Sequence, residues 1–149
     1  MVVTEVITVP RPPSEAFAYV ADFETVAEWD PGIHSSRRVA GDGGVGTVYA
    51  VQADFRGKTV PFTYTVTDLE QGRRVVLDGV GEKATSLDTI LFDPAGDGGT
   101  RITYTADFRL KGVLRLVEPF LGRTFTTLAR RALAGLEAAL GGASGSLGS

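Results

Sequence analysis

GVLRLVEPFLGRTFTTLARRALAGLEAAL, residues 112–140, is the stretch of this 149-residue chain that decides the fold. At about 100° of rotation per residue, one side of the predicted helix collects apolar and small side chains. They are Val113, Val117, Phe120, Leu121, Thr124, Leu128, Ala132 and Ala139. The other side carries Arg115, Arg123, Arg130 and Glu137. Such a helix would extend about 40 Å at 1.5 Å per residue, so it requires a large apolar partner surface.

The segments before this helix can supply that surface as strands. In these segments apolar and polar side chains alternate, or residues typical of turns lie at both ends. The predicted strands are residues 2–9, 33–40, 46–55, 59–69, 73–79, 84–92 and 100–110. Short connections such as Arg56-Gly57-Lys58 make neighbouring strands antiparallel. Pro61 cannot donate a ladder hydrogen bond, so it is expected at a sheet edge, at a bulge or on a non-bonded position.

Two short helices are expected between the first and second strands. Ser14 is the predicted N-cap of the first helix, and Asp22 caps the second, which ends before Asp30-Pro31-Gly32. The predicted fold class is therefore α+β. A curved, seven-stranded antiparallel sheet wraps around the long C-terminal helix.

The composition excludes several classes of protein. A net charge of −3 gives no basic field for nucleic acid or for an anionic membrane surface. The absence of Cys excludes disulfides, thiolate nucleophiles and Cys-ligated metals. There is neither an apolar run of membrane-spanning length nor a signal-peptide pattern, so a cytoplasmic protein is expected. We expect one domain over residues 1–140 and a flexible Gly/Ser-rich tail over residues 141–149.

Several short motifs occur in a characteristic order along the chain. They are Pro10-Arg11-Pro12-Pro13, Val20-Ala21-Asp22-Phe23, Glu28-Trp29-Asp30-Pro31, Gly46-Thr47, Phe92-Asp93-Pro94 and residues 99–104, followed by the terminal helix. Over residues 2–140 this order resembles the START-like (SRPBCC, Bet v 1-like) superfamily of helix-grip proteins. Within that superfamily it is similar to the bacterial polyketide cyclase/dehydrase and lipid-transport group. That group uses one scaffold for carriers, sensors and enzymes.

The resemblance implies a deep, mostly apolar cavity between the long helix and the sheet. Its occupant would be a small hydrophobic molecule such as a lipid, a polyketide or another polycyclic compound. The candidate ligand-binding residues are Trp29, Tyr49, Val51, Phe62, Tyr64, Ile90, Tyr104, Phe108, Phe120, Leu121, Thr124 and Leu128. A lining of this kind suits a ligand pocket. It equally suits a filled core, in which these side chains pack against one another.

Asp88 is the polar position that stands out on the predicted inner face. If Ile90 and Phe92 point inward, alternation also turns Asp88 and Ser86 inward. A carboxylate there would be partly desolvated, its pKa would rise, and it could act as a general acid or base or anchor a polar group of a ligand. The alternative is a bulge that turns Asp88 to solvent and Leu87 inward.

His34 and three tyrosines are the remaining candidates for proton transfer or ligand orientation. His34 could serve as an acid or base at the cavity mouth, or bind a metal with Asp30; the alternative is a surface His at the start of a strand. Tyr49, Tyr64 and Tyr104 could orient a carbonyl or hydroxyl group, or pack as cross-strand aromatic residues. The catalytic candidates are thus Asp88, His34 and Tyr104, with no metal site and no cofactor expected.

Pro119 interrupts the helical pattern of residues 112–140. Either it kinks one long helix, or residues 111–118 form a separate turn and Pro119 lies in the first turn of the main helix. In both cases residues 112–122, with glycine at each end, could move as a lid over the cavity entrance.

Three functions are compatible with these predictions. The first is a carrier or sensor of a small hydrophobic ligand. The second is a cofactor-independent cyclase or dehydratase that uses the same cavity. The third is a protein-interaction module with a filled core and an exposed apolar patch. None of them involves nucleic acid or an integral membrane segment, and each leaves the oligomeric state open.

Overall fold

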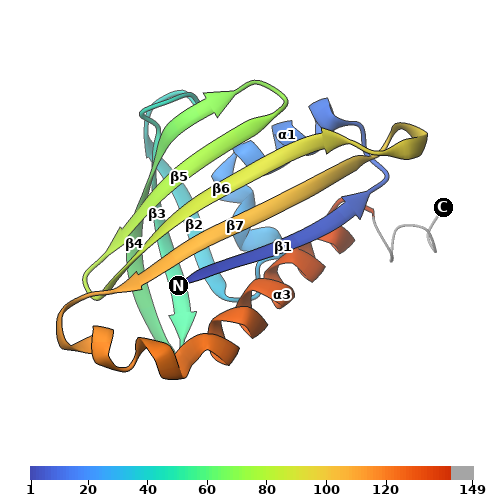
Figure 1. Cartoon of the computed structure of the whole chain (residues 1–149). Coiled ribbons are helices and arrows are strands. Elements are labelled where there is room, and N and C mark those ends of the chain that lie inside the picture. Colours follow the sequence, from blue (N-terminus) through green and yellow to red (C-terminus); the bar gives the residue numbers. More distant parts are fainter. Residues whose placement is uncertain (142–149) are drawn as a thin grey trace.

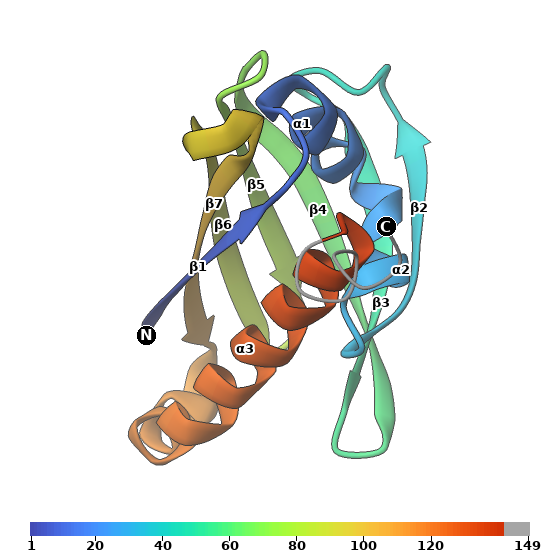
Figure 2. The same ribbon diagram turned by 90° about the vertical axis from the view of Figure 1, so that its right-hand side faces the viewer.

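A computed structural model describes residues 1–141, and these form one antiparallel sheet with helices on its concave side (Figures 1 and 2). The strands are β1 (Val2–Val9), β2 (Ile33–Ala40), β3 (Val48–Phe55), β4 (Lys58–Glu70), β5 (Arg74–Gly81), β6 (Ala84–Pro94) and β7 (Thr100–Leu110). The helices are α1 (Pro13–Ala21), α2 (Val26–Trp29) and α3 (Gly122–Ala139). Single 3₁₀ turns occupy Phe23–Thr25, Gly96–Gly98, Gly112–Leu116 and Glu118–Leu121. The predicted tail lies outside the described residues, apart from Gly141.

The seven-stranded α+β architecture predicted from the sequence is confirmed. The strand order is β1-β7-β6-β5-β4-β3-β2, and no predicted strand boundary moves by more than two residues. Arg56 and Gly57 form a two-residue hairpin with φ of 52° and 78°, the left-handed values of a type I′ turn. Pro61 pairs with Gln52 of β3 but lies beyond the β4–β5 pairing, which begins at Phe62 and Gly81. The predicted edge position is therefore correct.

The C-terminal helix is shorter than predicted. α3 begins at Gly122, not at Gly112, because Pro119 cannot continue an α-helix hydrogen-bond ladder and instead lies in the 3₁₀ turn Glu118–Leu121. The alternative of a separate preceding turn is thus the correct one. Val113 and Phe120 are 81% and 83% exposed, so their predicted inward orientation is wrong, and Ala139 is also exposed.

The buried side of α3 is set by its true start. Its buried residues are Phe125, Ala132, Leu133 and Leu136. α3 runs beside β1 and packs against α2 (Figure 2). A Cβ on Gly135 would lie 1.8 Å from the backbone oxygen of Trp29, so the α2–α3 approach requires glycine at this position.

The two short helices follow the prediction except at one cap. α1 begins at Pro13 with Pro12 as its N-cap residue and no side-chain cap, so the prediction for Ser14 is wrong. The fixed φ of proline at the first helical position explains this start. Asp22 does cap the next turn, because its side chain accepts a hydrogen bond from the Glu24 backbone N–H at 3.2 Å.

Antiparallel pairing gives the sheet two different ends. One, here called the α1 end, holds α1 and the β2–β3, β4–β5 and β6–β7 connections. The other, here called the hairpin end, holds the β3–β4 hairpin, the β5–β6 turn and residues 111–121 between β7 and α3 (Figures 1 and 2). These two ends differ in packing and in chemistry.

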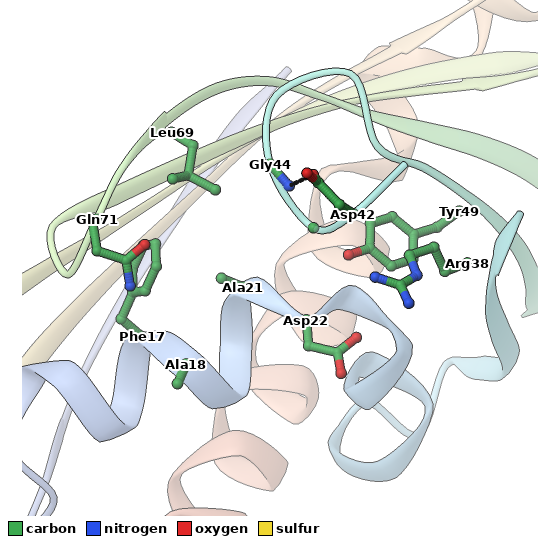
Figure 3. A pocket seen from close by; sticks show the side chains of 11 residues that line it. Phe17, Ala18, Ala21, Asp22, Arg38, Asp42, Gly44, Tyr49, Leu69 and Gln71 are labelled. Carbon is green, nitrogen blue, oxygen red and sulfur yellow. Dashed lines mark hydrogen bonds between the residues drawn. The ribbon is translucent and has the colours of Figure 1, made fainter. Parts of the chain in front are cut away.

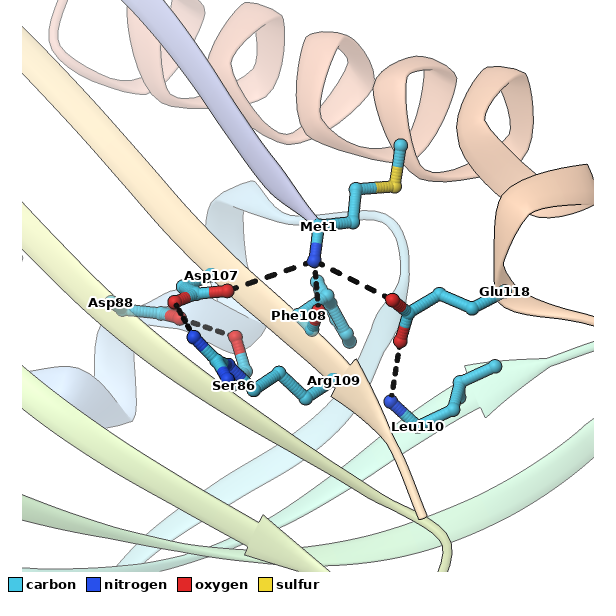
Figure 4. Close-up of polar contacts among 8 residues, drawn as sticks. All are labelled: Met1, Ser86, Asp88, Asp107, Phe108, Arg109, Leu110 and Glu118. Atoms are coloured by element: carbon cyan, nitrogen blue, oxygen red, sulfur yellow. Dashed lines mark hydrogen bonds and ion pairs between the residues drawn. The ribbon is translucent and has the colours of Figure 1, made fainter. Parts of the chain in front are cut away.

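Residues 111–121 are tied to the sheet by polar contacts. The Leu110 N–H donates to the Glu118 carboxylate at 2.9 Å, and Lys111 Nζ donates to the Gly81 carbonyl at 2.7 Å. The amino group of Met1 donates to the Phe108 carbonyl at 2.6 Å and lies 3.7 Å from both Asp107 and Glu118 (Figure 4). These contacts fix both flanks of the connection, and the predicted lid motion remains a prediction.

Candidate functional site

Asp88 faces the inside of the grip. β6 pairs with β5 and β7 without a register shift, and Asp88 lies between Leu77 and Ala106. Asp88 is 5% exposed, whereas its neighbour Leu87 is 43% exposed. The predicted inward orientation is therefore correct, and the bulge alternative is wrong. The alternation that buries Ile90 also buries Asp88.

The Asp88 carboxylate accepts two side-chain hydrogen bonds. Ser86 Oγ donates to Oδ1 at 2.5 Å, and the Tyr104 hydroxyl donates to Oδ2. Burial raises the pKa of Asp88 to about 6, although the donors Ser86 and Tyr104 act to lower it. Desolvation thus outweighs the hydrogen bonds and brings the titration of this carboxyl group close to neutral pH.

Asp30 is a second carboxylate near this group. It follows α2, and its Oδ1 accepts the Gly32 N–H at 2.8 Å. Burial raises the pKa of Asp30 to about 6; the Gly32 hydrogen bond lowers it, and the charge of Asp88 raises it further. The sequence analysis treated Asp30 only as a helix stop and as a possible metal partner of His34. One feature of the sequence could have indicated this position. Asp30 directly follows Trp29, and the Trp29 ring packs against Tyr104, the hydrogen-bond partner of Asp88.

Two tyrosines complete the polar cluster on the inner face. Burial, followed by the charge of Asp88, raises the pKa of Tyr64 and of Tyr104 well above the usual value for tyrosine. Both therefore remain protonated donors at neutral pH. The Tyr64 ring lies over Gly79, where an added Cβ would be 2.5 Å from the ring.

Trp29 closes the cluster from the side of α2. Its ring meets Tyr104 edge to face at 6.3 Å, and the residue is 3% exposed. Within residues 1–141 its indole Nε1 has no hydrogen-bond partner. A buried donor without a partner costs free energy, and it could donate to an acceptor on a ligand.

The structure brings together some of the sequence-predicted residues and separates others. Asp88, Tyr104, Tyr64 and Trp29 form one cluster. Tyr49, Val51 and Ile90 are buried in the packed core. Phe62, Phe108, Leu121, Thr124 and Leu128 are half-buried. Phe120 is exposed and lies outside the cluster.

His34 also lies apart from the cluster. Its side chain is 66% exposed and stands 3.9 Å from Asp54, so the surface alternative describes its position. Among residues 1–141 no three His, Asp or Glu side chains are grouped to hold a metal ion.

A separate pocket of about 500 Å³ opens at the α1 end (Figure 3). It lies between α1 and the β2–β3 and β4–β5 connections, with Phe17, Arg38, Asp42 and Leu69 in its lining. Of the predicted ligand-binding residues only Tyr49 contributes to it. It therefore lies apart from Asp88, Tyr104 and the other predicted ligand-binding residues.

Comparison with known proteins places this geometry in a family. Residues 1–141 match the family model described as "Polyketide cyclase / dehydrase and lipid transport". No curated protein matches. The fold is similar to that of the Zhui aromatase/cyclase from Streptomyces sp. R1128, with a TM-score of 0.81, 14% identity and coverage of 94% of this chain and 93% of that one.

Two further solved structures share the fold. The protein TTHA0849 from Thermus thermophilus has a TM-score of 0.79 and 22% identity, with coverage of 93% and 95% of the two chains. A START superfamily protein from Mycobacterium smegmatis has a TM-score of 0.74 and 19% identity, with coverage of 93% and 96%. The helix-grip architecture and the strand order agree with the matched family model: this chain belongs to the polyketide cyclase / dehydrase and lipid transport family.

Proposed function

We propose that this protein binds a small hydrophobic molecule between α3 and the sheet and holds one polar group of that molecule against Asp88 and Tyr104. The observation that carries the proposal is the buried Asp88 carboxylate, which accepts hydrogen bonds from buried Ser86 and half-buried Tyr104 on a mostly apolar inner face. Within the described residues no Lys, Arg or His forms an ion pair with Asp88. A buried carboxylate without a cation is costly, and such groups occur preferentially at functional sites.

The surroundings of Asp88 supply apolar contacts for the rest of the ligand. Phe62 and Phe108 from the sheet and Leu128 from α3 are half-buried, so they retain surface that a ligand can cover. The unpaired Nε1 of Trp29 supplies a donor. A ligand with an apolar body and a hydroxyl or carbonyl group matches both features.

Native mass spectrometry of the purified protein, followed by denaturing extraction, tests this proposal. The expected result is a stoichiometric lipid or polycyclic compound that is lost, or bound at least tenfold more weakly, in Asp88→Asn and Tyr104→Phe. The matched control is Asp78→Asn, the same substitution at a residue of β5 that pairs with exposed Leu87 and faces the convex side. Equal binding in Asp88→Asn and Asp78→Asn would refute the proposed anchor.

A second candidate is a cofactor-independent cyclase or dehydratase in the same site. The observation in its favour is that Asp88 and Asp30 both have a pKa of about 6, so either could exchange a proton near neutral pH. Asp88 would act as the acid or base, and Tyr104 would position it. The resemblance in fold to an aromatase/cyclase is compatible with this role.

Turnover and binding separate the two candidates. An enzyme requires turnover of an aromatic polyketide-like substrate that Asp88→Asn abolishes while retaining measurable affinity. It also requires a pH–rate profile with an inflection near pH 6. A carrier shows the same loss of affinity in that variant and no turnover in the parent.

A further inference from the structure

The connection between β7 and α3 exposes an unusual amount of apolar surface. Residues 112–121, here called the apolar tip, include Val113 (81% exposed), Leu116 (77%), Val117 (44%) and Phe120 (83%). Isolated exposed apolar residues are common, but a group of four within one short segment is typical of an interaction surface. The tip is also held in place at Leu110, Lys111 and Glu118 by the hydrogen bonds described above.

Basic residues flank the apolar tip. Residues 111–123 contain Lys111, Arg115 and Arg123 against the single carboxylate of Glu118, a net charge of +2 in a chain whose net charge is −3. Glu118 lies 3.7 Å from the amino group of Met1. Within the described part of the chain, Arg115 and Arg123 make no ion pair. Residues 111–123 therefore form a locally basic segment in a chain whose net charge is negative.

Other cations lie at the same end of the molecule. The β3–β4 hairpin carries Arg56 and Lys58, and the β5–β6 turn carries Lys83 beside Glu82 (Figures 1 and 2). The backbone N–H of Lys111 donates to the carbonyl of Lys83 at 2.9 Å, which joins the turn directly to the start of the tip. The hairpin end thus combines protruding apolar side chains with cations around them.

We propose that the apolar tip docks onto a membrane surface that contains anionic lipids. Leu116 and Phe120 enter the boundary between headgroups and acyl chains, while Lys111, Arg115 and Arg123 contact the headgroups. No helix of residues 1–141 is long and apolar enough to cross a bilayer, so the contact is interfacial. This proposal goes beyond the proposed ligand binding and does not depend on it.

Charge favours a membrane over a second copy of this chain. In a twofold symmetric contact through the tip, this patch of net charge +2 would lie against an identical patch of the other copy, and the like net charge would oppose association. An anionic lipid surface neutralises those cations and covers Leu116 and Phe120 at the same time. The charge of the tip and its exposed apolar side chains therefore both favour an anionic membrane.

Vesicle flotation with the full chain tests the proposal. We expect binding at low salt to phosphatidylcholine vesicles containing about 30 mol% phosphatidylserine, and weak binding to phosphatidylcholine alone. The double variant Arg115→Gln, Arg123→Gln should bind about 25-fold more weakly, about fivefold per cation. The double variant Leu116→Ser, Phe120→Ser should lose at least about tenfold.

The control is Val45→Ser, which removes an apolar side chain of similar exposure (64%) from the β2–β3 connection. It should bind vesicles as the parent does, and circular dichroism should show that all variants are folded. Three results would overturn the proposal: no binding to anionic vesicles at low salt, equal losses in Val45→Ser, or lipid-independent self-association that the Leu116→Ser, Phe120→Ser variant abolishes. Ligand retention in the tip variants tests the proposed function separately, since the tip contains neither Asp88 nor Tyr104.

Discussion

The large side chains on the inner face of the sheet are fully buried at the α1 end and only half-buried at the hairpin end. At the α1 end Leu77, Ile90 and Ile102 are fully buried, and the Phe17 ring of α1 meets Phe92 edge to face at 5.3 Å. Toward the hairpin end the small inward residues Ala84 and Ser86 are buried, but the large ones, Phe62, Phe108 and Leu110, are only half-buried. One continuous sheet therefore carries both a fully buried core and a region whose large side chains keep part of their surface exposed.

The difference arises from what covers each end. α1, the turn Phe23–Thr25 and α2 place Phe17, Phe23 and Val26 in the core. At the hairpin end α3 contributes buried Phe125, whose ring stacks on Phe108 at 4.9 Å, together with half-buried Thr124. Asp88 and its hydrogen-bond partners lie between these two regions of the inner face. That position is dry enough to raise the pKa of Asp88 and lies next to the residues that remain accessible.

The largest expected change in stability tests whether the two ends differ in packing, and it comes from a substitution at the α1 end. Phe92→Ala should lower the free energy of unfolding by about 3–5 kcal/mol, because it leaves a cavity among residues that cannot collapse. Phe108→Ala at the hairpin end should cost less, about 1–2 kcal/mol, since Phe108 is only half-buried and, within residues 1–141, its stacked aromatic partner is Phe125 alone. Urea denaturation measures both, and equal losses would show that the two ends are packed alike.

The second effect is a pH dependence of stability that comes from Asp88 and Asp30, the carboxyl groups between the two ends. The folded-state pKa values of Asp88 and Asp30 are about 6, above the usual 3.8, so the folded protein binds more protons between about pH 4 and pH 6. The free energy of unfolding therefore falls as pH rises through this window, by up to about 3 kcal/mol per carboxyl group.

Asp88→Asn should remove the part of this fall in the free energy of unfolding that is due to Asp88. The variant should be about 1–3 kcal/mol more stable than the parent above pH 6 and nearly equal to it near pH 4. Urea titrations between about pH 4 and pH 8 measure the difference, with Asp78→Asn as control. Profiles of Asp88→Asn and parent that run parallel over this range would contradict the burial argument.

A third effect sharpens the position of the polar cluster. Gly79→Ala should destabilise the fold by about 1–3 kcal/mol, because its Cβ would lie 2.5 Å from the Tyr64 ring and force that ring to move. Gly96→Ala, whose Cβ would meet nothing within 4 Å, is the control. Thermal unfolding and tyrosine fluorescence follow the change. If Gly79→Ala were as stable as Gly96→Ala, the ring would not be seated over β5 as described.

The smallest effect concerns the apolar tip. Phe120→Ser should change the free energy of unfolding by no more than about 0.5 kcal/mol, because an 83% exposed side chain contributes little to the core. Denaturation without lipid measures this value. A loss comparable to that of Phe108→Ala would mean that Phe120 packs against the sheet after all.

The sequence predicted what depends on local periodicity. Alternation located the seven strands, and continuing it from Ile90 and Phe92 placed Asp88 inside. It failed where the outcome depends on chain continuity or on distant elements. Phe120 was placed inward because one helix was assumed across Pro119, and the true start of α3 made Phe125 a buried residue instead. Asp30 was missed because its approach to Asp88 arises only when α2 folds against the sheet.

The pairing of β1 with β7 has a consequence for the order of folding. Val2 pairs with Asp107 and Val9 with Thr100, so among residues 1–141 the one strand that pairs with β1 lies about a hundred residues later in the chain. During synthesis β1 must wait as an unpaired strand until β7 has left the ribosome, and such non-local closure is slow compared with the pairing of adjacent hairpins. We expect β3 to β6 to acquire hydrogen-exchange protection first and β1 last, so the nascent chain is most vulnerable to aggregation just before its final strand arrives.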